Sequence, residues 1–275
     1  MPKLTFASSV LAAAVVTLAA SAPALADQLA DIKSKGTLVC GTLGTAEPFS
    51  FPNPQTREIQ GYDVDFCGAL AKSLGVKLEL KLISVAARIP ELQQGRIDVI
   101  AANLGWTPER AEQIAYSDGY YASLQKVATK RTDGYKKVDD LSGKRISATK
   151  CSTSELAVKK ALPTATTMTF QDPPNAFLAM QQGKVEGFAV SEIMLVKFKQ
   201  QVETSSPIDI LEPPLMVEAW GVGMRKGETA LIQHVNTTLQ SMEKSGEAAK
   251  IFDKWLGANT PYTMRRGFKI EPIKG

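Results

Sequence analysis

Two short segments of the sequence have the composition of a carboxylate-binding site. In Thr107-Pro108-Glu109-Arg110, the threonine can cap a helix and the proline suits its first position. Free backbone N–H groups then lie near Arg110, whose guanidinium can bind both oxygens of a carboxylate. Ser152-Thr153-Ser154-Glu155 is a capping-box pattern whose N–H groups offer a second half-site for the same anion. Taken alone, each segment favours an ordinary capped helix over a binding site.

The residues required by other common chemistries are scarce. The single histidine, His234, lies in a helical stretch, and a Ser-His-Asp or Cys-His arrangement would have to use it. No nucleophile-elbow or phosphate-binding glycine motif follows a predicted strand, which disfavours hydrolase chemistry and nucleotide binding. A zinc site lacks its ligands. We therefore expect no metal and no cofactor.

The overall composition is that of a globular protein without a nucleic-acid surface. Of 275 residues, 44% are hydrophobic and 22% charged, which places the chain outside the disordered and fibrous classes. The formal net charge of +4 comes from 32 basic and 28 acidic residues that are evenly mixed. Nucleic-acid binders usually carry a basic stripe, so we expect no nucleic-acid partner.

Residues 1–26 have the pattern of a secretory signal peptide. A basic start precedes an apolar run and Ala24-Leu25-Ala26, an A-x-A cleavage pattern, so the mature chain is expected to begin at Asp27. The apolar run is shorter than the roughly 20 residues that span a bilayer. Asp27 stands where a lipid-anchored protein would have cysteine. We expect a soluble, exported protein without a lipid anchor.

Strand and helix patterns alternate along the chain. This β-α-β-α order predicts an α/β fold with parallel sheets and helices on both faces. Predicted strands are 37–41, 78–83, 97–104, 145–149, 166–170 and 185–190, and predicted helices are 62–74, 88–94, 152–162, 174–182 and 192–201.

Two of the three cysteines fall on surfaces predicted to face each other. Cys40 ends an apolar run, and Cys67 lies on the apolar stripe of the predicted helix 62–74. An exported protein can form disulfides, so we predict a Cys40–Cys67 bond that leaves Cys151 unpaired. The alternative is two buried thiols that pack without pairing.

A short pattern occurs twice. Gln93-Gln94-Gly95-Arg96-Ile97-Asp98 is matched by Gln181-Gln182-Gly183-Lys184-Val185-Glu186, and each follows an amphipathic segment and precedes an apolar strand. Glycine is a common helix terminator, so chance is one explanation. Six equivalent positions in a row favour two similar lobes.

Several blocks, in order, resemble the family-3 extracellular solute-binding proteins, the polar amino-acid receptors of ABC importers. Gly61-Tyr62-Asp63-Val64-Asp65-Phe66 resembles the family signature, and Tyr116-Ser117-Asp118-Gly119-Tyr120, Leu141-Ser142-Gly143-Lys144 and Lys254-Trp255-Leu256-Gly257 resemble other family blocks. The resemblance implies a type II periplasmic-binding fold, with two α/β lobes joined by two crossing hinge strands and a ligand in the cleft. It places lobe 1 at residues 27–125 plus 220–275 and lobe 2 at residues 126–219.

The resemblance also assigns residues to the ligand. It implies that Arg110 binds the carboxylate of an amino acid, that Asn103 and Gly105 touch its ammonium and carboxylate, and that Ser152 and Thr153 complete the site from lobe 2. Trp106 either shapes the cleft wall or packs within its lobe. The chain departs from the family at Ser191, where many relatives carry an ammonium-binding aspartate. Either Glu192 replaces that aspartate, or Ser191 and a carbonyl suffice, or the ligand is not a simple α-amino acid. A further alternative is that Ser191 and Glu192 only cap a helix.

Few residues indicate which amino-acid side chain the site would select. Basic-ligand receptors of the family often have an acid near Leu43 and an aromatic residue near Ala46 or Val85, and this chain has neither. Arg88 resembles the arginine by which glutamate/aspartate receptors reach a side-chain carboxylate, although it could instead cap a lobe surface. Phe49 and Phe51 either both wall the pocket, or one of them belongs to the core, because they alternate as on a strand. We expect a polar, neutral or acidic amino acid as ligand.

The function predicted from the sequence is therefore that of a monomeric periplasmic receptor that closes on an amino acid and delivers it to an ABC permease in the inner membrane. One alternative is a dehydratase of the prephenate or arogenate type on the same fold, with Glu192 as proton donor. Another is a receptor that serves a signalling partner instead of a permease.

Overall fold

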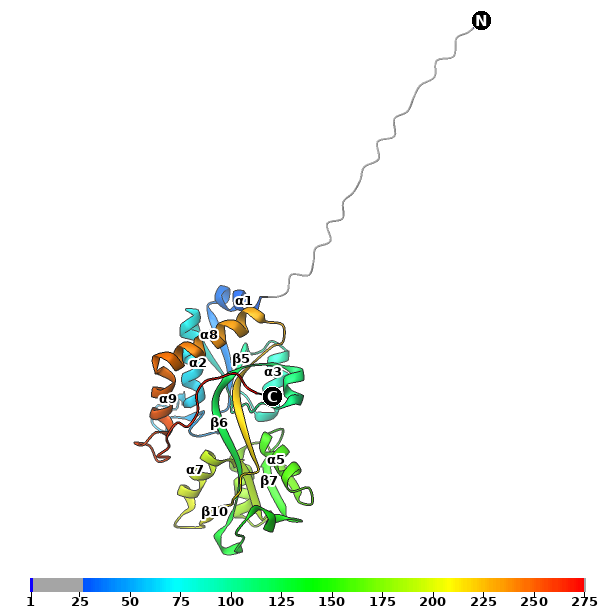
Figure 1. Cartoon of the computed structure of the whole chain (residues 1–275), viewed down its shortest axis with the longest axis vertical. Helices are drawn as coiled ribbons and strands as arrows, with labels where there is room; N and C mark the ends of the chain where they lie inside the picture. Colours follow the sequence, from blue (N-terminus) through cyan, green and yellow to red (C-terminus); the bar gives the residue numbers. More distant parts are fainter. Residues whose placement is uncertain (2–26, 275) are drawn as a thin grey trace.

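Two groups of elements are joined by a pair of long strands (Figure 1). The computed structural model describes Met1 and residues 27–274, so the predicted signal peptide lies outside the described residues except for its first. Lobe 1 contains β1 (Thr37–Thr42), β4 (Lys77–Leu82), β5 (Val99–Ile100), α1 (Gln28–Lys35), α2 (Tyr62–Leu74), α3 (Arg88–Gln93), α4 (Pro108–Gln113), α8 (Thr229–Ser245) and α9 (Glu247–Leu256). Lobe 2 contains β7 (Arg145–Thr149), β8 (Thr166–Phe170), β9 (Gly187–Ser191), β10 (Ile208–Ile210), α5 (Thr153–Ala161), α6 (Pro173–Gln181) and α7 (Glu192–Val202).

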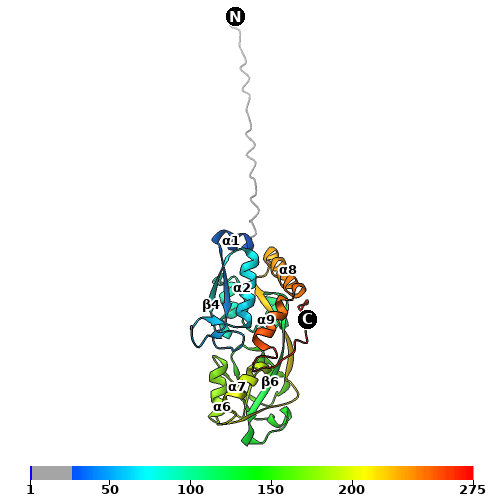
Figure 2. The same ribbon diagram turned by 90° about the vertical axis from the view of Figure 1, so that its left-hand side faces the viewer.

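The connecting strands are β6 (Ala115–Lys130) and β11 (Met216–Met224). Figure 2 shows β6 continuing from the lobe with α1, α2, α8 and α9 into the lobe with α6 and α7. Smaller elements are the ribbon of β2 (Phe51–Pro52) and β3 (Ile59–Gln60) and the short 3-10 turns η1 (Val85–Ala87), η2 (Arg131–Asp133) and η3 (Val138–Leu141).

All strands except β2 and β3 belong to one hydrogen-bonded sheet in the described residues. Its order is β4-β1-β5-β11-β6-β9-β7-β8, and β10 adds to β6. Pairing is parallel between β1 and β4, β1 and β5, β7 and β8, and β7 and β9, as the sequence predicts. It is antiparallel where β11 meets β5 and β6 and where β6 meets β9, so the expectation of purely parallel sheets is wrong there. Strands β6 and β11 run in opposite directions because the chain leaves lobe 1 along β6 and returns to it along β11.

The repeated Gln-Gln-Gly pattern ends two helices in the same way. Gly95 and Gly183 have φ angles of 69° and 70°, a left-handed conformation that glycine adopts without a Cβ clash. The following amides close equivalent turns, Arg96 N to Glu91 O and Lys184 N to Ala179 O, both at 3.0 Å. The two junctions therefore lie at matching points of the two lobes. The predicted lobe boundaries fall within β6 and β11 and stay a prediction.

Helix α2 has the predicted bounds, 62–74, and packs its apolar stripe into lobe 1. Tyr62, Phe66, Cys67 and Leu70 are fully buried, and Gly75 ends the helix at a φ of 71°. The predicted disulfide is confirmed, because Cys67 of α2 is bonded to Cys40 of β1. Cys151 is free and exposed.

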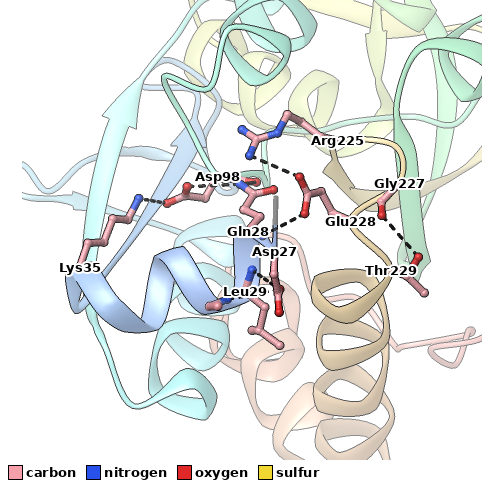
Figure 3. A network of polar contacts seen from close by, with 10 residues as sticks. Asp27, Gln28, Leu29, Lys35, Asp98, Arg225, Gly227, Glu228 and Thr229 are labelled. Atoms are coloured by element: carbon pink, nitrogen blue, oxygen red, sulfur yellow. Dashed lines mark hydrogen bonds and ion pairs between the residues drawn. The ribbon is translucent and has the colours of Figure 1, made fainter. Parts of the chain in front are cut away.

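Both ends of the described chain are fastened to lobe 1. Figure 3 shows the first end, where the Gln28 amide donates to Glu228 Oε2 at 3.0 Å and Lys35 Nζ lies 2.7 Å from Asp98 Oδ2. Near the other end, Arg266 forms an ion pair with Glu243, and Gly119 N donates to Glu271 O at 2.8 Å. The C-terminal segment therefore lies against strand β6. Among the described helices, none has both the length and the apolar character needed to cross a membrane.

The disulfide generates a stability prediction. A bridge across a sequence separation of 27 restricts the unfolded chain, so Cys40→Ala/Cys67→Ala should lower the free energy of unfolding by about 3 kcal/mol in urea titrations. The matched control is Cys151→Ala, which removes the free cysteine and should leave the urea midpoint unchanged. Equal midpoints for the double variant and the wild type would contradict a stabilising role for the bond.

Candidate functional site

A cavity of about 40 Å³ lies where the two lobes meet. Lobe 1 contributes Leu43, Val85, Arg88 and Asn103, the connecting strands contribute Gln125 and Trp220, and lobe 2 contributes Thr149, Ser152, Thr153, Ser154, Pro173, Val190, Ser191 and Met194. The sequence analysis selected Arg88, Asn103, Ser152, Thr153 and Ser191 from this set. The remainder of its predicted site residues lie outside the lining.

Several polar side-chain atoms at this cavity are buried without a hydrogen-bond partner among the described residues. They are both amide atoms of Asn103, Thr149 Oγ1 and Ser191 Oγ. A buried polar atom without a partner costs stability, and native proteins leave few of them. Because these atoms come from both lobes and surround one cavity, they are suited to a polar guest held between the lobes.

Arg110 joins the lobes beside this cavity. Thr107 caps α4 as predicted, since its Oγ1 accepts from Arg110 N at 3.2 Å. The Arg110 guanidinium donates to Gly105 O at 2.7 Å and, across the cleft, to Cys151 O at 2.8 Å. Ser152 caps α5 by accepting from Glu155 N at 3.1 Å. The two predicted half-sites therefore face each other, although Arg110 itself does not line the cavity.

Arg88 is a buried cation in the wall of the cavity, which excludes the alternative that it caps a lobe surface. Only 3% of the residue is exposed, and its guanidinium donates to the carbonyls of Val85, Ala102 and Asn103 at 2.9–3.0 Å. Burial, followed by the charge of Arg110, lowers the pKa of Arg88 to about 9. Two positive groups therefore lie close together at this end of the cleft.

Asp63 binds the backbone of Asn103, a residue of the cavity lining, and was not predicted as a site residue. Its carboxylate accepts from Asn103 N at 2.9 Å and from Tyr120 Oη at 2.8 Å. Asn103 has a φ of 50°, an uncommon backbone conformation that the Asp63 contact helps to hold. Burial raises the pKa of Asp63 to about 7, against the lowering effect of Tyr120, Asn103 and Arg88.

Glu218 is a second functional candidate that the sequence analysis missed. It lies on β11, is 7% exposed, and its Oε1 accepts from Trp220 Nε1, Gln125 Nε2 and Thr153 Oγ1. Burial raises the pKa of Glu218, while these hydrogen bonds and the charge of Arg110 act in the opposite direction. No local sequence signal identified it, because β11 was not among the predicted strands.

Five predicted site residues besides Arg110 are located away from the cavity lining. Glu192 forms an ion pair with Lys126 at 2.7 Å, and Gly105 packs against the Glu218 carboxylate. Trp106 faces a separate hollow beside the C-terminal segment. Phe49 is fully buried against Tyr121 and Trp220, and Phe51 packs edge-on against Trp255. Phe49 thus belongs to the core, the second of the alternatives given above for it.

The family assignment follows from comparison with known proteins. A family model for bacterial extracellular solute-binding proteins, family 3, matches residues 38–258. The chain belongs to this family.

Individual relatives agree with the family in fold and extent. The ABC transporter glutamine-binding protein GlnH of Bacillus subtilis is 29% identical over 84% of this chain and 85% of its own length. The L-glutamate/L-aspartate-binding protein of Pseudomonas aeruginosa is 28% identical over 94% of this chain and 90% of its own. A solved structure described as the ancestral amino acid-binding protein AncCDT-1, a precursor of cyclohexadienyl dehydratase, superposes with a TM-score of 0.75 at 30% identity, covering 84% of this chain and all of that one. The two-lobe type II fold predicted from the sequence is confirmed by such neighbours.

The raised pKa of Asp63 predicts a pH dependence of stability. The folded protein retains a proton on Asp63 up to about pH 7, whereas the unfolded chain releases it near pH 4. The folded state therefore binds more protons in this window, and the Asp63 contribution to the free energy of unfolding falls as pH rises from about 4 to 7, by on the order of a few kcal/mol.

Urea titrations of the wild type and Asp63→Asn across pH 4–8 measure this contribution. The difference between the two proteins should change with pH in that direction and level off above pH 7. A difference that is constant with pH would show that Asp63 is ionised throughout.

Proposed function

We propose that this chain is the periplasmic receptor of an ABC importer and that it binds a polar amino acid, neutral or acidic, between its lobes. The observation that carries the proposal is the interlobe cavity, which is lined by Arg88 and by polar atoms of Asn103, Thr149 and Ser191 that have no hydrogen-bond partner within the described part of the chain. Membership of the solute-binding family and the ligands named for the relatives from Bacillus subtilis and Pseudomonas aeruginosa support the same class of ligand.

The charge of the site favours a ligand with at least one carboxylate. Arg88 lines the cavity, Arg110 lies beside it, and the residues of the lining include no acid. A basic side chain would bring a third positive charge into a poorly hydrated space, which is costly without a counter-charge. A carboxylate would offset the arginines, so glutamate and aspartate, or the uncharged glutamine, suit the site better than lysine or arginine.

Neutral oxygen atoms of the cavity lining bind the ammonium group of the ligand in this proposal. Glu192 is paired with Lys126, and its carboxylate is therefore engaged outside the cavity. Ser191 Oγ, Thr149 Oγ1 and Asn103 Oδ1 are buried, line the cavity and lack partners among the described residues, so they are the acceptors that an ammonium can reach.

Closure of the lobes converts binding into a signal for the permease. Arg110 to Cys151, and an ion pair between Glu47 of lobe 1 and Lys197 of α7 at 2.8 Å, join the lobes directly. A ligand that also touches both lobes favours this closed arrangement by its differential affinity. We propose that the signal peptide directs export and is then removed, and that the mature protein, a monomer without a lipid anchor, presents the closed surface to the permease in the inner membrane.

The dehydratase alternative has weaker support. It requires a proton donor in the cavity, and the candidate from sequence, Glu192, is bound to Lys126. One structural neighbour is a precursor of cyclohexadienyl dehydratase, and the alternative is therefore worth testing. We therefore propose binding without turnover.

A thermal-shift screen tests the ligand class directly. Mature, ligand-stripped protein should be stabilised by an acidic or neutral polar amino acid and not by lysine or arginine, because a ligand that binds only the folded state raises its stability. At 100 times its Kd the ligand should add about 2.7 kcal/mol. Stabilisation by prephenate or arogenate alone, with product formation, would instead establish the enzyme.

Arg110→Ala should weaken amino-acid binding at least 100-fold, because it removes a charge-assisted contact and the bridge between the lobes. Calorimetric titration with the amino acid identified in the screen measures the loss, and circular dichroism verifies the fold. Arg96→Ala is the matched control, since Arg96 is an exposed arginine of lobe 1 that forms an ion pair with Glu91. An unchanged Kd for Arg110→Ala would remove Arg110 from the site.

A further inference from the structure

The Glu218 carboxylate lies at the base of the cleft, in contact with both lobes and both connecting strands. Its Oε1 accepts from Thr153 Oγ1 of α5 at 3.0 Å and from Gln125 Nε2 of β6 at 2.7 Å. It also accepts from Trp220 Nε1, two residues along its own strand, at 2.6 Å. Thr153, Gln125 and Trp220 all line the interlobe cavity, so Glu218 lies directly behind the cavity wall.

A second contact extends this network to the next residue of α5. Gln125 donates to Glu218 through its nitrogen and accepts from Ser154 Oγ through its oxygen, at 2.6 Å. Thr153 and Ser154, the first two residues of α5, are thus both tied to side chains of the connecting strands. Because they are neighbours, the pair of contacts restrains the position of the first turn of α5 relative to β6 and β11.

Lobe 1 is shaped to receive the same carboxylate. A Cβ atom at Gly105 would overlap the Glu218 carboxylate, so a side chain at position 105 would have to displace it. Gly105 O accepts from Arg110, and the Arg110 guanidinium continues to Cys151 O immediately before α5. Glu218 therefore lies between the Arg110-bearing part of lobe 1 and the first turn of α5 in lobe 2.

We propose that Glu218 is a positioning residue of the ligand site, which holds Thr153 and the first turn of α5 in the closed arrangement before a ligand is bound. The inference deepens the proposed function, since it rests on lobe closure around a ligand. Three donors converge on one buried oxygen, and a buried group that loses its hydrogen-bond partners costs free energy. We expect opening of the cleft to separate Thr153 from Glu218, because the neighbouring Ala219 O accepts from Trp106 N of lobe 1 at 2.9 Å and so ties this part of β11 to lobe 1. The Thr153 contact then favours closure independently of the ligand.

The closed population determines how much of the ligand's binding free energy is used to close the lobes. A receptor whose binding-competent state is less populated has a proportionally weaker apparent affinity. Removing Glu218 should therefore have two effects: the ligand-free protein should open, and its ligand should bind more weakly, by about tenfold.

Small-angle X-ray scattering of ligand-stripped protein tests the first effect without knowledge of the ligand. Glu218→Ala should have a larger radius of gyration than the wild type. Glu218→Gln, which keeps an acceptor oxygen in the same place, should be closer to the wild type. Val217→Ala is the matched control, because Val217 is the preceding residue of β11 and is 68% exposed. Equal radii for the wild type and Glu218→Ala would overturn the proposal.

A double-mutant cycle distinguishes positioning through Thr153 from general damage to the hinge. Calorimetric titrations with L-glutamate and L-glutamine compare Glu218→Ala, Thr153→Val and the double variant, each verified as folded by thermal melting. If Glu218 acts through the Thr153 hydroxyl, the double variant should bind no more weakly than the weaker single variant. Losses that multiply in the double variant, or tighter binding by Glu218→Ala, would overturn the proposal. If the wild type binds neither amino acid, the assignment of ligand class fails, whereas scattering still decides the role of Glu218.

Discussion

The antiparallel pairing of β6 with β11 is the constraint on which the rest of the molecule depends. The pairing extends from Met216 opposite Gln125 to Met224 opposite Ala115, with irregularities beside Gly221. Lobe 1 attaches at one end, where β11 pairs with β5, and lobe 2 at the other, where β6 pairs with β9. A change in the angle between the lobes must therefore bend or twist these two paired strands. Gln125 and Trp220 project from these strands into the cavity lining, and Glu218 lies behind them, so the three side chains are placed to link the backbone of the hinge to the cavity.

The electrostatics of the cleft follow from burying charge in a small space. Arg88 satisfies its guanidinium on three backbone carbonyls, and Arg110 on two, so neither forms an ion pair that would cancel its charge. Glu218 and Asp63 are buried nearby, and burial raises the pKa of both carboxyl groups. Both carboxyl groups accept hydrogen bonds from neutral donors, so neither pairs directly with Arg88 or Arg110 in the described part of the chain. The lining of the cavity accordingly contains one cation, Arg88, beside neutral polar and apolar side chains.

Local patterns predicted those elements whose signal is contained within a few residues. Helix α2 was located to the residue because its apolar spacing is regular and glycines lie at both ends. The caps at Thr107 and Ser152 were also predicted, since each depends on a side chain and an amide three residues apart. Strand β6 was missed because it is buried almost throughout its length and lacks the alternation that marks a half-exposed strand. Glu192 and Trp106 were assigned to the cleft by position, but the direction of each side chain is determined by what packs around it.

The sequence by itself determined the repeated helix endings, the caps, the pairing of Cys40 with Cys67 and the family, because each is written in neighbouring residues or in the order of short blocks. Only the tertiary structure decided which polar atoms meet at the cavity. Glu218 is 65 residues from Thr153 and 93 from Gln125 along the chain, and Asp63 is 40 residues from Asn103. Contacts over such separations exist because two lobes and two crossing strands pack together, and no local periodicity records that packing.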